Sequence, residues 1–194
     1  MVHIEPVLEA AQKPSNLPPL EDIVSNCPGL LAIQKTPTNL HGVKYPLVKK
    51  ADDDPTHVWV KFGRYITMDE AKTQNYVVQV LDKKDDAAVK APRVYLAFNH
   101  NQFGYIVMEF IEGQVCEKSD AQLIAAALES LVSIKSPFSQ PGPVGGGCIK
   151  HPFFVERTSP IPYETIEELE QHINGVSVLF YLVLSHFVHS SIFG

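Results

Sequence analysis

The 194-residue sequence predicts an α+β protein, because strand-forming and helix-forming segments are separated along the chain. β-branched and aromatic residues dominate short apolar runs in the first half, such as His57–Phe62 and Tyr105–Met108. Beyond Gly113, apolar residues recur at helical spacing behind helix-capping signals. Strands come first and helices second, which favours an antiparallel sheet over alternating βαβ units.

The predicted strands are short runs bounded by turn residues. They cover Leu30–Ile33, Val43–Val48, His57–Phe62, Ala91–Phe98 and Tyr105–Met108. Asn99–Gly104 predicts a hairpin turn between the last two runs, because Asn and Gly adopt the backbone conformations that turns need. Residues 1–22 are proline-rich and weakly patterned, and they predict an arm or a short leading helix.

Three predicted helices each begin at a capping box, a Ser or Thr followed three residues later by Glu or Gln. The boxes are Thr67/Glu70, Ser119/Gln122 and Thr165/Glu168. The first helix places Ala71, Val78 and Leu81 on one face, and the third turns Ile166, Leu169 and Ile173 inward before Gly175 ends it. Between the second and third, residues 136–147 form a loop rich in Pro, Gly and Ser.

The composition excludes some classes of function. The formal net charge is −6, and Lys and Arg form no stripe, which argues against nucleic-acid binding. Cys27, Cys116 and Cys148 lie far apart, as expected for free thiols in a reducing compartment. The first residues lack the basic start and apolar run of a signal peptide, so we expect a cytoplasmic protein.

Lys61 is the first candidate for a binding residue, because it is the one charged residue in an apolar strand. A lone Lys in such a strand usually faces solvent at a sheet edge. Alternatively, its ammonium lies in a cleft, neutralises phosphate oxygens and is held by a carboxylate. Glu70, in the first turn of the next helix, can supply that carboxylate, although capping by Thr67 also explains a Glu there.

The segment from Met108 to Gly113 is the second candidate. A strand that ends in an apolar residue, followed by a short extended link and a Gly, can present backbone donors and acceptors to a purine. The alternative is an ordinary strand that turns at a Gly. The order of Lys61, Glu70 and this strand–Gly unit favours the nucleotide interpretation.

These segments resemble the aminoglycoside-phosphotransferase and choline-kinase-like families, the small-molecule relatives of protein kinases, and in particular their fungal branch. The matching residues are Val60–Gly63, Asp69–Ala71, Ala91–Tyr95, Tyr105–Gly113, Gly146–Gly147, His151–Phe154 and Tyr163–Glu170. The resemblance spans roughly residues 28–174. It implies an arm (1–27), a protein-kinase-like N-lobe of twisted antiparallel sheet plus one helix (28–113), a partial helical C-lobe (114–175) and a hydrophobic tail (176–194).

The resemblance also implies an activity, the ATP-dependent phosphorylation of a small-molecule hydroxyl with Mg²⁺. Lys61 would contact the ATP phosphates and Glu70 would hold Lys61. The carbonyl of Glu109 and the amide of Ile111 would take the adenine edge, with Met108 behind. The turn that covers the phosphates would lie near residues 36–43, which contain a single glycine, Gly42.

The rest of the sequence does not supply the residues that transfer the phosphoryl group in this family. The family supplies a catalytic Asp and Mg²⁺-binding Asn and Asp residues through His-x-Asp-x-x-x-x-Asn and a later Asp. When His186 is placed at the His of this motif, Val188 stands at the Asp position. We therefore expect a kinase-family protein that is inactive as it stands. The alternatives are a non-catalytic pseudokinase that binds a nucleotide or a protein, and a tail-anchored membrane protein.

Residues 176–194 contain no charged side chain other than histidine, unlike the helix before them. They have three explanations: a translated intron beginning at a splice-donor-like Val176–Ser177, a tail anchor just long enough to span a bilayer, or a buried helix or strand. Because the acceptor pocket of this fold belongs to the second lobe, the acceptor stays unnamed. An uncovered apolar face would favour self-association.

Overall fold

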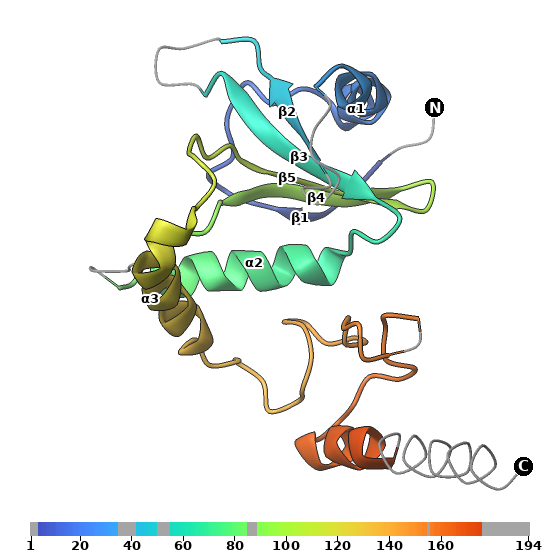
Figure 1. Cartoon of the computed structure of the whole chain (residues 1–194). Coiled ribbons are helices and arrows are strands. Elements are labelled where there is room, and N and C mark those ends of the chain that lie inside the picture. Colours follow the sequence, from blue (N-terminus) through green and yellow to red (C-terminus); the bar gives the residue numbers. More distant parts are fainter. Residues whose placement is uncertain (1–3, 35–41, 50–54, 85–88, 155, 176–194) are drawn as a thin grey trace, which may run out of the picture. The chain divides into compact units, whose positions relative to one another are not determined.

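The computed structural model describes residues 4–34, 42–49, 55–84, 89–154 and 156–175. It divides into two compact units, Met1–Lys135 and Ser136–Gly194, which are considered separately. The first unit confirms the predicted α+β class with a five-stranded antiparallel sheet of order β1-β4-β5-β3-β2 (Figure 1). Its strands are β1 (Pro6–Glu9), β2 (Gly42–Pro46), β3 (His57–Gly63), β4 (Val94–His100) and β5 (Phe103–Glu109).

Strands β2 to β5 form at four of the five short apolar runs that were predicted to be strands, with bounds that differ by a few residues. The hairpin between β4 and β5 is tighter than expected, because its strands extend to His100 and Phe103. Asn101 and Gln102 alone make the turn, with φ of 45° and 67°. Asn adopts this left-handed conformation more readily than most residues. The turn lies within the predicted segment.

The predicted strand at Leu30–Ile33 is wrong, because these residues end helix α1 (Leu20–Gln34). Pro28 lies inside this helix, and Pro with Gly normally interrupts one. The helix persists because Ile23 and Cys27, one turn apart, are fully buried against the sheet. Burial also raises the pKa of the Cys27 thiol to about 12, so this thiol stays uncharged.

The first residues also differ from the prediction of an arm or short helix. Pro6–Glu9 forms the edge strand β1, which pairs with β4 through Leu8 and Ala97. The helix that follows begins at Leu20 and runs past the expected limit of the arm at residue 27. Strand β1 has only four residues, and it forms by pairing with a strand far along the chain. Its local sequence therefore contains little strand pattern.

Helices α1 and α2 (Met68–Leu81) cover opposite faces of the sheet, whereas one packed helix was expected (Figure 1). Each face has its own buried cluster. On the α1 side these are Ile4, Ile23, Cys27, Val43, Tyr45, Val58, Val60, Leu96, Phe98, Tyr105 and Val107. On the α2 side they are Ile66, Met68, Ala71, Val94, Ala97, Ile106 and Met108. A register shift between Val94 and Leu96 puts Val94 and Ala97 on one face despite their odd separation.

The outer edge of β2 is closed by a side chain. The Gln34 amide donates to the Lys44 carbonyl at 2.6 Å and accepts from the Lys44 N–H at 2.9 Å. These two bonds imitate those of a neighbouring strand. The last residue of α1 therefore occupies the backbone groups by which β2 could pair with another strand.

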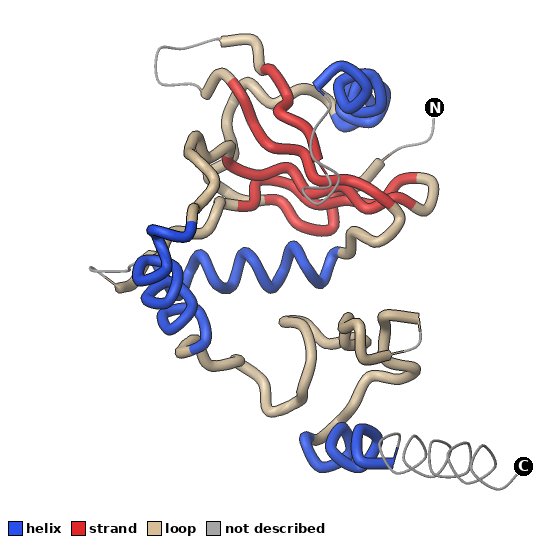
Figure 2. Tube along the Cα trace, in the orientation of Figure 1, coloured by secondary structure: helices blue, strands red, loops and turns tan. Residues whose placement is uncertain are grey.

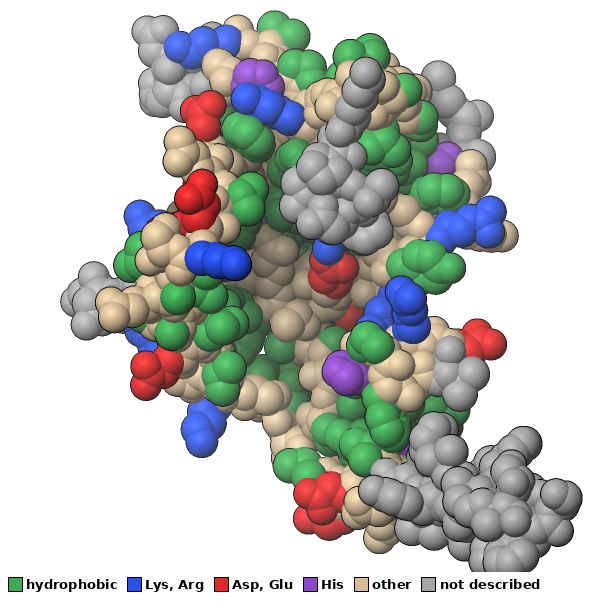
Figure 3. All heavy atoms as spheres, viewed as in Figure 1, with side chains coloured by type: hydrophobic (Ala, Val, Ile, Leu, Met, Phe, Trp, Pro, Cys, Tyr) green, Lys and Arg blue, Asp and Glu red, His purple; other side chains and the backbone are tan. Residues whose placement is uncertain are grey.

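Helix α3 (Ala121–Val132) follows a short 3-10 turn (Lys118–Asp120). The capping box at this point joins Glu117 and Asp120 and not Ser119 and Gln122, so the predicted box is wrong. No residue of α3 is buried, and Leu123 and Val132 are 72% and 83% exposed. Figure 3 shows hydrophobic side chains gathered over this helix. Self-association through an uncovered apolar face stays a prediction.

The second unit is mainly loop, as Figure 2 shows, with a helix over residues 166–175. Ser159 organises the loop, because its hydroxyl accepts from the Ile149 N–H and donates to the Ile161 carbonyl. Thr165 accepts from the Glu168 N–H, which is one bond of its predicted box, whereas the Glu168 carboxylate accepts from the Glu164 N–H. Ile166 does not face inward, because it is 54% exposed.

The tail over residues 176–194 lies outside the described residues, and so does the segment 35–41 where the phosphate-covering turn was expected. Gly42 itself begins β2. Among the described helices, none has the length and apolar character needed to cross a membrane.

Gly104 fixes the approach of the loop that leads into α2, and its replacement tests this packing. A Cβ at this position would collide with the backbone carbonyl of Ile66. We expect Gly104→Ala to lower the free energy of unfolding by about 1–3 kcal/mol, the usual cost of overpacking. Gly113→Ala is the matched control, because nothing lies within 4 Å of its added Cβ, and it should change stability by no more than about 0.5 kcal/mol. Urea unfolding measures both, and equal values would contradict the packing described.

Candidate functional site

Lys61 lies in the interior of the sheet and not at its edge. Its strand, β3, is flanked by β5 and β2, and Lys61 is in register with Ile106 on one side and Gly42 on the other. The side chain is 26% exposed. The edge interpretation of this lysine is therefore wrong, and its ammonium lies partly sheltered over the sheet.

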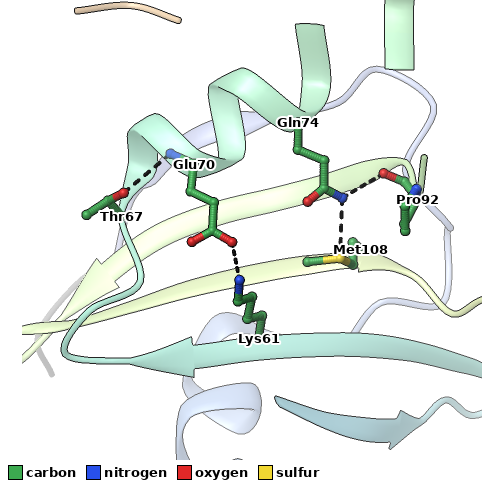
Figure 4. Close-up of polar contacts among 6 residues, drawn as sticks. All are labelled: Lys61, Thr67, Glu70, Gln74, Pro92 and Met108. Atoms are coloured by element: carbon green, nitrogen blue, oxygen red, sulfur yellow. Dashed lines mark hydrogen bonds and ion pairs between the residues drawn. The ribbon is translucent and has the colours of Figure 1, made fainter. Parts of the chain in front are cut away.

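Glu70 supplies the carboxylate that pairs with Lys61 (Figure 4). The Lys61 ammonium Nζ and Glu70 Oε1 form an ion pair, which confirms the pairing predicted from the sequence. Thr67 is the N-cap of α2, and its hydroxyl accepts from the Glu70 N–H at 3.4 Å. Glu70 thus takes part in the cap through its backbone while its side chain reaches across to β3.

Gln74 is a contact residue that the sequence analysis missed. Its Nε2 donates to the Pro92 carbonyl at 2.8 Å and to Met108 Sδ at 3.4 Å (Figure 4). These bonds fasten α2 to β5 and to the chain entering β4. The spacing offered a signal, because residues four apart lie on the same side of a helix, so Gln74 faces the sheet with Glu70.

The other three predicted site residues surround the end of β5. Met108 is buried at 6% exposure, and Ile111 is 52% exposed beyond the strand. The Glu109 N–H donates to the Arg93 carbonyl at 2.8 Å, and the Glu109 carboxylate accepts from the Arg93 N–H at 3.2 Å. Among the five predicted residues, the recorded contacts join Lys61 to Glu70, and Met108, Glu109 and Ile111 form a separate group.

The Glu109 carboxylate affects the pKa of the nearby Tyr95 phenol. Burial raises the pKa of Tyr95, the Glu109 carboxylate raises this pKa further, and the Arg93 guanidinium lowers it. The Tyr95 hydroxyl therefore stays protonated at neutral pH. It can serve as a donor, and it adds no negative charge beside the end of β5.

Phe110 and its neighbours form an aromatic group that the sequence analysis also missed. The Phe110 ring lies 6.5 Å from the Trp59 ring at an interplanar angle of 23°, and 6.2 Å from the His57 ring. The Lys44 ammonium lies 4.3 Å from the Phe110 centroid, within cation–π range. Phe110 follows β5, so its contact with β2 and β3 depends on the sheet order and leaves no signal in the local sequence.

The charges of this arrangement suit an anion. The Lys61 ammonium can donate charge-assisted hydrogen bonds to phosphate oxygens. In the part of the chain that the structure describes, no three His, Cys, Asp or Glu residues are grouped as a metal site would require.

The comparisons with known proteins found no match: no family model matches the chain, and no curated protein or solved structure resembles it significantly. The assignment of a function therefore rests on the residues and contacts described above.

The N-cap of α2 can be tested separately from the ion pair. We expect Thr67→Ala to lower the free energy of unfolding by about 1 kcal/mol, because the Glu70 N–H loses its side-chain acceptor. Thr67→Ser retains the hydroxyl and should cost less than half as much. Thermal or urea unfolding of the three proteins measures the effect, and an equal loss in both variants would assign the role of Thr67 to its methyl group.

Proposed function

We propose that this chain is a kinase-like protein that binds a nucleotide and does not itself transfer the phosphoryl group. The observation that supports this proposal most strongly is the ion pair between Lys61 and Glu70. It joins an interior strand to the helix that crosses the sheet, and it holds a partly exposed ammonium on the face of the sheet that carries the half-buried Trp59. An ammonium so held can bind polyphosphate as a point charge.

The order of the elements also supports the proposal. Strands β2 and β3, helix α2 and strands β4 and β5 follow one another in sequence, and in the sheet the strands run β4-β5-β3-β2. This order is compatible with the antiparallel sheet and crossing helix that the family resemblance leads us to expect, and it supports the proposal to that extent. Helix α1 and strand β1 are additions to that plan, and they occupy the far face and the far edge from Lys61.

We infer the lack of transfer from the family motif. The 194 residues contain no His-x-Asp-x-x-x-x-Asn segment, which in the family supplies the Asp that orients the acceptor hydroxyl and the Asn that holds Mg²⁺. In this proposal Mg²⁺ enters with ATP. The acceptor small molecule of the wider family has no assigned pocket here.

A second candidate function is protein interaction. It is favoured by the apolar residues of α3, of which Leu123, Leu128 and Val132 are more than half exposed. Exposed apolar groups of this kind often mark association surfaces. Such a role is compatible with a nucleotide-binding pseudokinase, and either a second copy or another protein could cover the helix.

Nucleotide binding is tested by thermal unfolding with and without Mg-ATP. We expect saturating Mg-ATP to raise the melting temperature, because a ligand at a hundredfold excess over its Kd stabilises the folded state by about 2.7 kcal/mol. Lys61→Ala should abolish the rise. Lys72→Ala is the matched control, because Lys72 is paired with Asp69 on the same helix as Glu70 and should keep the rise.

The rise is measured within each variant, so a change in its basal stability does not affect the comparison. A folded wild-type protein with no rise would contradict nucleotide binding. Mg²⁺-dependent release of ADP that disappears in Lys61→Ala would instead contradict the claim that the chain lacks phosphoryl transfer.

A further inference from the structure

We propose that the outer edge of β2 is a binding site for an extended acidic peptide of another protein, which adds to the sheet as a further strand. Strand β2 is the last strand at one edge of the sheet, beside α1 (Figure 1). Gln34 closes the middle of this edge, because its amide bonds both backbone groups of Lys44. This inference does not depend on the nucleotide site.

The backbone of β2 defines the groups that a partner strand would meet. In an antiparallel pair, the N–H and C=O groups of successive residues point to opposite sides. Lys44 directs both groups away from β3 and toward Gln34, with hydrogen bonds of 2.9 Å and 2.6 Å. Gly42 and Pro46, two residues away on either side, therefore direct their groups the same way. Pro46 offers only a carbonyl, so Gly42 and Lys44 supply the donors.

The Gln34 amide has the chemistry of a peptide group. Its Nε2 donates where the N–H of a neighbouring strand would donate, and its Oε1 accepts where a carbonyl would accept. A single side chain can satisfy only one residue of the edge in this way. A peptide strand would also bond the backbone of Gly42 and Pro46, and main-chain bonds of this kind are the source of affinity when a strand adds to a sheet.

The last turn of α1, which carries Gln34, is weakly held. Every residue of that turn, 31–34, is exposed. The buried residues of the helix, Ile23 and Cys27, precede it, and Pro28 removes one backbone hydrogen bond between the two parts. Both hydrogen bonds of Gln34 are exposed to solvent, where water can replace them. This turn can therefore release β2 while the buried part of α1 stays in place.

The charge of β2 and β3 favours an acidic partner, because these two strands contain Lys and His but no Asp or Glu. The charge of Lys61 is balanced by Glu70, whereas the Lys44 ammonium lies over the neutral ring of Phe110. A residue directly opposite Lys44 on an added strand has its Cβ about 5 Å away on the same face, so a Glu there can pair with this lysine. A second copy of β2 would instead bring another Lys44 to the edge, and like charges oppose that pairing.

Fluorescence anisotropy of a labelled peptide tests this edge directly. The probe is a capped peptide of about six residues in which Val and Thr flank a central Glu. We expect it to bind the full chain, and to bind Gln34→Ala about tenfold more tightly, as removal of a closed state that is about 90% populated would give. Gln122→Ala, at an exposed glutamine of α3, is the matched control and should bind as the unaltered chain does.

Two altered peptides separate backbone pairing from charge. N-methylation of the Glu amide removes the donor that takes the place of Gln34 Nε2, and it should weaken binding to Gln34→Ala by at least about tenfold, because the Lys44 carbonyl then has no partner. Replacement of the Glu by Lys should weaken binding by about fivefold, the effect of like charges on opposite strands. Lys44→Met should remove this difference between the Glu and Lys peptides.

Equal binding of the methylated and unmethylated peptides overturns the edge site, and so does a Gln34→Ala variant that binds no peptide or binds it only as tightly as the unaltered chain. Sedimentation of Gln34→Ala without peptide tests the other occupant: a dimer would assign the edge to a second copy and overturn the peptide partner. Should Gln34→Ala fail to fold, the comparison of the methylated and unmethylated peptides on the unaltered chain decides the matter. The Mg-ATP thermal shift tests the nucleotide site separately.

Discussion

The ion pair between Lys61 and Glu70 is the contact on which the account of this protein depends. It connects an interior strand to the first turn of α2, and it holds an ammonium over the sheet where solvent still reaches it. Its geometry is set by neighbours that are not themselves charged. The Thr67 hydroxyl starts the helix at the correct residue, and Gly104 lets the preceding loop approach β5. Changes at either position would move Glu70 relative to Lys61.

The two faces of the sheet have different roles. One face is filled by α1 and a continuous apolar cluster, so it stabilises the fold. The other is shared: α2 covers β4 and β5, while the half formed by β2 and β3 carries Lys44, Trp59 and Lys61. Cations beside half-buried rings stabilise the fold less than apolar, buried side chains would at these positions. This asymmetry is the physical argument for the proposed ligand site.

Much of this arrangement could be predicted from the sequence, where local pattern determines it. Short runs of β-branched and aromatic residues predicted β2 to β5, the capping signal predicted α2, and the positions of Lys61 and Glu70 indicated their pairing. Features that depend on distant contacts could not be predicted in this way. Helix α1 continues through Pro28 because burial outweighs local propensity, β1 exists only through its pairing with β4, and Phe110 meets Trp59 only because β5 lies beside β3.

The most direct test of the central contact is a double-mutant cycle on the free energy of unfolding, with Lys61→Met, Glu70→Gln and the double variant. The pair is about one-quarter to one-third exposed, so its coupling should exceed the smallest values found for surface pairs. We predict a coupling of at least about 0.5 kcal/mol. Single-variant effects that add to within about 0.3 kcal/mol would mean that the two side chains act independently, and would contradict the account.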